Sequence, residues 1–392
     1  MSEAPQSRLK AAGNGGNEMS MTQQQITQSQ QRYPRYRRVR AAFCLGLASL
    51  CAAIPSYPAN EIISRLTNES ANEPANEPAN ESANESANEV GHTKFCTNEL
   101  RALREHASPT RVRTDLRNGI TDQRRLQHRA IARTAQWQLG NLYATGQCVP
   151  QDWHEAIAWY RKAADLGSTD AQTALGILYA NGYGTAKDLA EAAKWYRAAA
   201  IEGNPIAAVR LGGLYKRGAS AAMDLPEAAK WFAQSAAAGN AEGQFKLALL
   251  RADARAGAVD LVAARTLMRQ SADQGFALAE ANLGLMYLNG QGGDQSDAQA
   301  LAWTLRAAFK GVASAQALAG ALYANGRGIP MDLVAAHMWL ALASTAGDAN
   351  AARELSSVAT QLTSEQIAEA QHKAENWTIS HSNLNRLEPP KR

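Results

Sequence analysis

The sequence has few of the residues and motifs that usually carry catalysis. Its four cysteines and seven histidines include no C-x-x-C pair and no spacing typical of metal ligands. The one S-x-x-K tetrapeptide runs from Ser7 to Lys10, and no G-x-x-x-x-G-K-[ST] loop occurs. We therefore predict that the protein is not an enzyme and that it binds no metal ion or cofactor.

Aromatic residues and net charge are also low. Aromatic residues make up 6% of the chain, and the net charge of +4 over 392 residues is too small to indicate nucleic-acid binding. Alanine is abundant, which favours closely packed helices over sheets.

Long apolar segments are missing. The uncharged run from Ala41 to Ile54 has fourteen residues, whereas about 20 are needed to span a bilayer. Five arginines between Arg32 and Arg40 precede this run, which is the layout of a secretory signal. We predict that residues 1–56 are a polar leader with a signal peptide, so that the protein is periplasmic or secreted. An uncleaved anchor in the inner membrane is the alternative.

The small number of cysteines suggests a pairing. Removal of the signal would remove Cys44 and Cys51 and leave Cys96 and Cys148. An even number of cysteines in an exported chain indicates a disulfide bond between them. Two unrelated buried thiols are the alternative.

Two segments lead to the main part of the chain. Residues 57–90 are predicted to be a disordered acidic linker, because six tandem tetrapeptides (TNES ANEP ANEP ANES ANES ANEV) offer nothing to bury. Residues 91–131 are basic and compatible with helix, which favours a polar N-terminal cap on the array that follows. Binding of an anionic polymer is the alternative for this cap. The absence of aromatic residues from 97–133 argues against nucleic acid.

From residue 132 to residue 347 the sequence repeats every 36 residues. The phrase LGNLYATG at Leu139 returns as LGILYANG at Leu175 and as LGGLYKRG at Leu211. Tyrosine and tryptophan recur at fixed positions, and we expect them to be the structural anchors of the repeats. These residues are Tyr143, Trp159, Tyr179, Trp195, Tyr215, Trp231, Tyr287, Trp303, Tyr323 and Trp339.

Each unit is predicted to form two helices. Ala135, Leu139 and Leu142 follow helical spacing in the first unit, and Gly146 would end that helix in a left-handed conformation. The second helix would begin at a capping residue: Asp152, Asp188, Asp224, Asp260, Ser296 or Asp332. Glu or Gln three residues later, in four of the six units, indicates a capping box rather than paired catalytic acids. A single hairpin cannot bury its aromatic residues alone, so neighbours must stack.

This pattern resembles the Sel1-like repeat, a relative of the tetratricopeptide repeat, and Ala171 to Gly203 match it best. The resemblance implies an all-α fold, a right-handed α/α superhelical solenoid of six repeats over residues 132–347. It implies a non-enzymatic adaptor that binds other proteins, in bacteria often in the cell envelope. Residues 348–380 resemble the helical cap of such arrays, and 381–392 would be a tail. Some relatives act on β-lactams, which leaves an envelope enzyme acting on peptidoglycan or β-lactams as the alternative.

The fourth unit departs from the pattern, because Ala248, Arg251 and Leu267 replace glycine, tyrosine and tryptophan. The first helix of each unit lines the concave face in related solenoids, so we expect its polar residues to contact a partner. We predict a basic groove in mid-array that accepts an acidic segment of another protein. A solvated helix face beside a decayed repeat is the alternative. The predicted contact residues are Gln138, Arg210, Lys216, Arg217, Lys246, Arg251 and Asn282.

Overall fold

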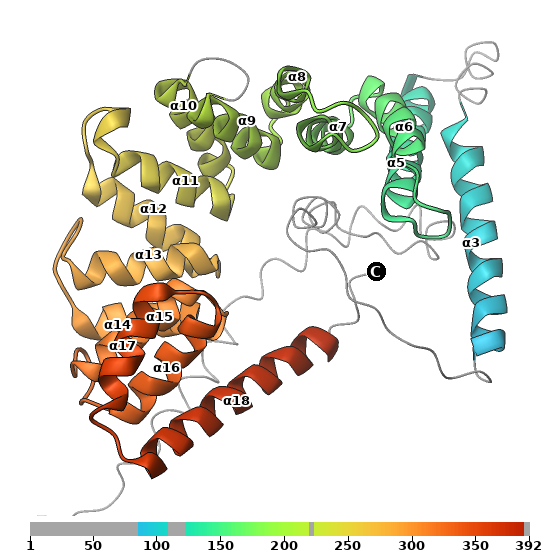
Figure 1. Ribbon diagram of the computed structural model, residues 1–392. Helices are drawn as coiled ribbons and strands as arrows, with labels where there is room; N and C mark the ends of the chain where they lie inside the picture. Colours follow the sequence, from blue (N-terminus) through green and yellow to red (C-terminus); the bar gives the residue numbers. More distant parts are fainter. Residues whose placement is uncertain (1–84, 109–121, 219–222, 388–392) are drawn as a thin grey trace, which may run out of the picture. The chain divides into compact units, whose positions relative to one another are not determined.

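The structure is a computed structural model that describes residues 85–108, 122–218 and 223–387. Fifteen α-helices and no strand occur in these ranges (Figure 1). The predicted leader and signal lie outside them, as do residues 57–84 of the predicted linker. The all-α solenoid of two-helix repeats is confirmed.

Each repeat contributes a first and a second helix, and consecutive helices pack against each other from α5 to α17 (Figure 1). The first helices are α5 Asp122–Thr145, α7 Thr169–Asn181, α9 Pro205–Arg217, α11 Ala241–Arg251, α13 Ala277–Leu288 and α15 Ala313–Ala324. The second helices are α6 Trp153–Asp165, α8 Leu189–Ile201, α10 Leu225–Ala237, α12 Leu261–Asp273, α14 Asp297–Phe309 and α16 Leu333–Thr345. The flanking helices are α3 Glu85–Ala107, which packs on α5, α17 Ala349–Ala359, and α18 Ser364–Leu387, which packs on α16.

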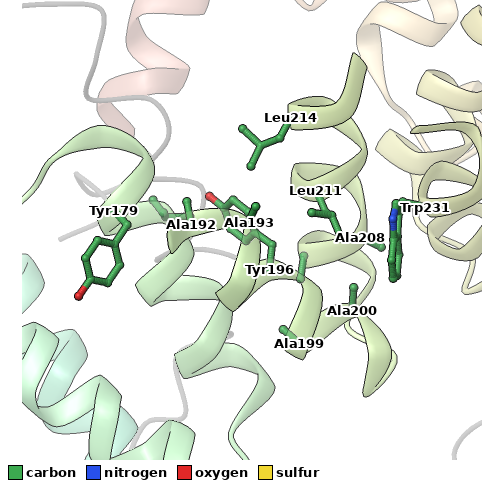
Figure 2. Close-up of a cluster of buried hydrophobic side chains, with 12 residues drawn as sticks. Tyr179, Ala192, Ala193, Tyr196, Ala199, Ala200, Ala208, Leu211, Leu214 and Trp231 are labelled. Carbon is green, nitrogen blue, oxygen red and sulfur yellow. The ribbon is translucent and has the colours of Figure 1, made fainter. Parts of the chain in front are cut away.

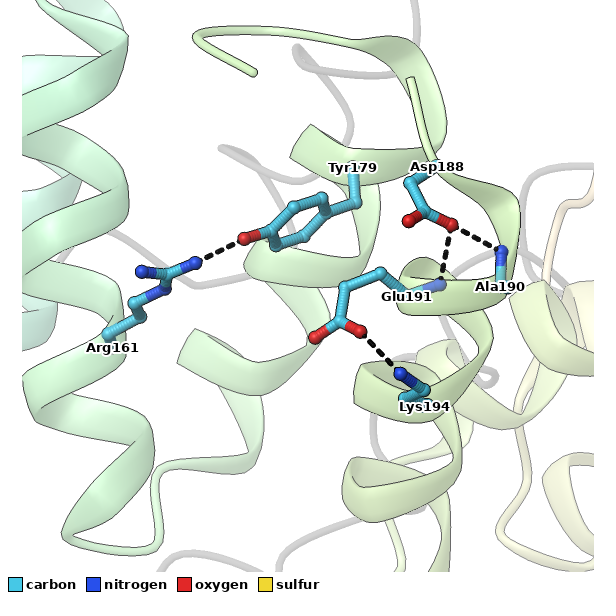
Figure 3. A network of polar contacts seen from close by, with 6 residues as sticks. All are labelled: Arg161, Tyr179, Asp188, Ala190, Glu191 and Lys194. Carbon is cyan, nitrogen blue, oxygen red and sulfur yellow. Dashed lines mark hydrogen bonds and ion pairs between the residues drawn. The ribbon is translucent and has the colours of Figure 1, made fainter. Parts of the chain in front are cut away.

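The second helices begin as the sequence predicts. Asp188 accepts hydrogen bonds from the backbone N–H groups of Ala190 and Glu191, each at 2.9 Å (Figure 3). The other five predicted capping residues likewise accept from the first turn of their helices. These bonds satisfy N–H groups that have no partner inside the helix.

The capping box is only half formed. The backbone N–H of Asp188 does not pair with the Glu191 side chain, because it donates to the carbonyl oxygen of Tyr179 at 2.9 Å. The Glu191 carboxylate instead pairs with Lys194 Nζ at 2.8 Å (Figure 3). The same bond links the capping residue to the first helix in all six repeats, so it fixes the two helices of each hairpin together.

The interior is shared between neighbouring repeats. One buried cluster combines Tyr179 of α7, Tyr196 of α8 and Leu211 of α9, and Trp231 of α10 belongs to the same cluster (Figure 2). Two repeats therefore contribute to one core. This arrangement is what stacking of hairpins that cannot bury their own aromatic residues requires.

Close approach of the two helices in a hairpin depends on a glycine. A Cβ atom at Gly176 would lie 2.4 Å from Cε1 of Tyr196, far inside van der Waals contact. In repeat four the two helices approach each other with a different pair of residues. Ala248 takes the place of the glycine, and the flexible Met268 takes the place of the aromatic ring. Both side chains are buried.

Helix α3 takes the place of the second helix of a preceding repeat. In repeats two, five and six, the second glycine of the connecting loop meets the start of the preceding second helix. A Cβ at Gly292, for example, would lie 2.1 Å from the carbonyl oxygen of Leu261. In repeat one this glycine is replaced by Cys148, which keeps the left-handed backbone (φ 63°) and forms a disulfide bond with Cys96 of α3.

Two further contacts place α3 in the same way. Arg104 Nη2 donates to the hydroxyl of Tyr143 at 3.0 Å, as Arg269 Nη1 does to Tyr287 at 3.0 Å. Gln136 Nε2 donates to the carbonyl of Ala107 at 3.0 Å, and Gln316 at the same position of repeat six donates to Ala308. Helix α3 is thus the second half of a further repeat.

Three predicted boundaries need correction. Helix α3 begins at Glu85, inside the predicted linker, because the tetrapeptides after Pro78 contain no proline and supply alanine and glutamate. The boundary between cap and array at residue 132 falls within the continuous helix α5. The predicted tail is helical up to Leu387, because the first residues that stop a helix there are Pro389 and Pro390.

Candidate partner-binding surface

Four of the predicted contact residues share one position of the first helices. Gln138, Arg210, Lys246 and Asn282 are all partly exposed. Asn282 uses its Nδ2 group within its own helix, donating to the carbonyl of Leu278 at 2.7 Å. The cations of this column are therefore Arg210 in α9 and Lys246 in α11, two helices that contact each other.

Arg217 adds a third cation to this face. It follows Arg210 by seven residues, which is close to two helical turns, and it is exposed. Both guanidinium groups lie near the buried hydroxyl of Tyr196. Burial raises the pKa of Tyr196, and the charges of Arg210 and Arg217 offset part of that rise. We call Arg210, Arg217 and Lys246 the first-helix patch.

Lys216 and Arg251 lie on a different side. Arg251 follows Lys246 by five residues, which turns it about 140° around the helix axis. Its carbonyl oxygen accepts from the N–H of Asp260 at 2.8 Å, which places Arg251 at the loop that joins α11 to α12. The charge of Lys216, in the last turn of α9, acts on Asp253 of that loop. The seven predicted residues thus do not form one groove.

The loop after α11 is itself organised by charge. Arg255 donates to Asp253 Oδ2 at 2.7 Å, and this hydrogen bond, with a smaller contribution from Lys216, lowers the pKa of Asp253 to about 2. Asp253 therefore stays ionised and neutralises part of the positive charge of Arg255 and Lys216.

Arginine–tyrosine contacts between repeats were not predicted from the sequence. Arg161 donates to the hydroxyl of Tyr179 in the next repeat (Figure 3), and Arg197 does the same to Tyr215. The signal was present, since arginine follows the Trp-Tyr pair in the first two repeats. These two cations lie on the second helices α6 and α8, so they do not belong to the first-helix patch.

Other kinds of site find little support among the described residues. No three His, Cys, Asp or Glu side chains come together there as a metal ion would require. The buried His337 has its pKa lowered by burial and so is neutral at pH 7. No helix described here has both the length and the apolar character needed to cross a bilayer.

The geometry defines an α/α solenoid with a polar, partly cationic surface on its first helices. The chain belongs to the Sel1 repeat family, whose model matches residues 134–168, 169–204, 205–240, 241–276, 277–311 and 313–348. Proteins of this family typically mediate protein–protein interactions and are generally non-catalytic scaffolds.

The chain is also similar to solved structures. The chain is 32% identical to a Sel1 repeat protein from Oxalobacter formigenes, with 55% of this chain and 88% of that chain covered and a TM-score of 0.52. A putative Sel1 repeat protein from Klebsiella pneumoniae is 25% identical, with 52% and 99% covered and a TM-score of 0.36. A protective antigen from uropathogenic Escherichia coli strains, described as displaying an SLR fold, is 22% identical, with 74% and 85% covered and a TM-score of 0.36. No curated protein matches the chain.

Proposed function

We propose that the protein is a non-enzymatic scaffold of the bacterial cell envelope that binds an acidic segment of a partner protein. The observation that carries this proposal is the first-helix patch, in which Arg210, Arg217 and Lys246 face the same way on two neighbouring helices. Clustered cations of this kind attract acidic segments and speed their association.

Export to the periplasm or beyond is part of the proposal. The disulfide between Cys96 and Cys148 supports it, because such bonds persist in oxidising compartments and are rare in the cytosol. A signal in residues 1–56 would deliver the chain, and an uncleaved anchor would keep it at the inner membrane instead. Cell fractionation of the full chain, with the mass of its N-terminus determined, separates these two outcomes.

Charge reversal tests the patch. We expect the triple variant Arg210→Glu, Arg217→Glu and Lys246→Glu to bind a partner recovered from envelope extract at least tenfold more weakly, since each charge contributes about 0.5 kcal/mol or more. The dissociation constant would be measured for one stoichiometric partner by calorimetry.

The matched control is Arg124→Glu, Arg129→Glu and Lys194→Glu, which changes the net charge equally at exposed positions elsewhere. This control should bind as the unchanged protein does. Equal affinity of the patch variant would contradict the proposal, and turnover of a β-lactam or a cell-wall substrate by the purified protein would favour an enzyme instead.

A further inference from the structure

Repeat four differs from its neighbours on a surface separate from the first-helix patch. At the junction of repeats three and four, the arginine–tyrosine contact is replaced by Ala233 and Arg251. Arg251 is exposed, so a cation stands at the surface where other repeats place a tyrosine. Arg255 nearby has a side chain that is 75% exposed.

Exposed apolar side chains accompany these cations. Val259 is 47% exposed and belongs to the same loop as Arg255, while Val262, 66% exposed, lies in the first turn of α12. Met223, 61% exposed, occupies in repeat three the position that Val259 occupies in repeat four. The same loop position is therefore apolar and exposed in both repeats, and in repeat four Val259 and Val262, three residues apart, form the apolar area.

A cleft of about 310 Å³ continues from Val262 along α12. Its walls include Arg265, Arg269 and Tyr287. Arg265 stands where other repeats have apolar residues such as Ile157 and Leu301, which is why sequence reasoning missed the cleft.

Both arginines of the cleft are held in place. The Arg265 guanidinium lies 3.8 Å above the ring of Tyr287 and donates to the carbonyl of Asp294 at 3.0 Å. Gly293 leaves room for it, because a Cβ there would lie 2.7 Å from Arg265 Nη1. Arg269 donates to the Tyr287 hydroxyl, and its Nε lies 3.9 Å from the half-exposed Asp273. Each guanidinium has five N–H donors, so both keep donors for an anionic ligand.

We propose that this surface of repeat four, made of Arg251, Val259, Val262 and the Arg265–Arg269 cleft, is a docking site for a protein segment that alternates acidic and apolar residues. Carboxylates would bind the arginines, and an apolar side chain would cover Val262. The apolar area favours a peptide over a purely anionic polymer, which has nothing to bury there. The proposal rests on the scaffold function and adds a second contact surface to it.

The test uses a labelled nine-residue peptide of alternating glutamate and leucine, titrated with the full chain by fluorescence anisotropy. We expect Arg251→Glu with Val262→Asp to weaken binding at least tenfold, and a glutamate–glycine peptide to bind at least tenfold more weakly than the leucine peptide. Circular dichroism would verify that the variant is folded.

The variant Arg124→Glu with Arg129→Glu, at exposed positions outside both surfaces, serves as the control and should keep its affinity for the peptide. The first-helix variant Arg217→Glu with Lys246→Glu is measured beside it. If the first-helix variant loses binding and the repeat-four variant keeps it, this inference is wrong while the proposed function stands. Binding of polyphosphate that is tighter than that of the peptide and insensitive to Val262→Asp would also overturn it. If the first-helix variant alone fails to capture the partner, while the repeat-four variant captures it and still binds the peptide, the proposed function is supported and this inference is wrong.

Discussion

Replacing both Arg306 and Lys310 with methionine is expected to destabilise repeat five, and with it the junction to repeat four, by about 3–5 kcal/mol. Glu280 on α13 is fully buried, and its carboxylate is held by Arg306 Nη2 at 2.8 Å and Lys310 Nζ at 2.7 Å. Without these cations a buried charge would be left without compensation. Hydrogen exchange of the α12 and α13 amides reports this loss locally, which suits an array that opens in parts.

Adding Glu280→Gln to that double variant should restore most of the lost stability. The five other repeats carry glutamine or alanine at this position, and Gln316 donates to the carbonyl of Ala308 in the preceding repeat. A glutamine at 280 has the equivalent carbonyl of Ala272 in reach, which now accepts from Arg306 at 3.3 Å. If the triple variant exchanges as fast as the double variant, buried charge is not the cause of the loss.

Removal of the disulfide bond is expected to cost about 4 kcal/mol in the chain-entropy model, since Cys96 and Cys148 lie 52 residues apart. The suitable variant is Cys96→Ala with Cys148→Gly, because the left-handed backbone at 148 favours glycine, as in the equivalent loops. Helix α3 should then exchange its amides much faster and expose Leu103 and Ala107, which now pack against α5.

The effect should remain local, because each repeat contacts only its neighbours. Amides of α14 and α16 should exchange as in the unchanged protein, and dithiothreitol should reproduce the result without any substitution. Unchanged protection of α3 after reduction would mean that packing alone holds this helix.

Sequence periodicity predicted the array well, because a repeat unit of fixed length places each residue type in the same contact every time. The capping residues and the left-handed glycines illustrate this. The half repeat formed by α3 was not predicted, because more residues separate it from the first repeat than separate the helices within the array. Arg104 and Tyr143 lie 39 residues apart, whereas the same contact elsewhere joins residues 18 apart, such as Arg161 and Tyr179.

The candidate surface was harder to predict. A column of polar residues indicated the first-helix patch, but grouping it with Arg251 ignored the rotation of five residues around the helix. The cleft beside Tyr287 could not be predicted from the sequence, because Arg265 occupies a position that is apolar in most repeats. Its guanidinium is positioned by a contact with the next loop, the hydrogen bond to the carbonyl of Asp294, which the sequence does not show.

The central claim is that neighbouring hairpins are stable only through their shared interior. Urea unfolding, followed by circular dichroism, of the single hairpin 168–203 and of the full chain tests it most directly. The account predicts that the isolated hairpin has little helix even without urea, because its Tyr179 and Tyr196 would lose the cover of Leu211 and Trp231. A hairpin that is helical alone and unfolds at the same urea concentration as the full chain would contradict it.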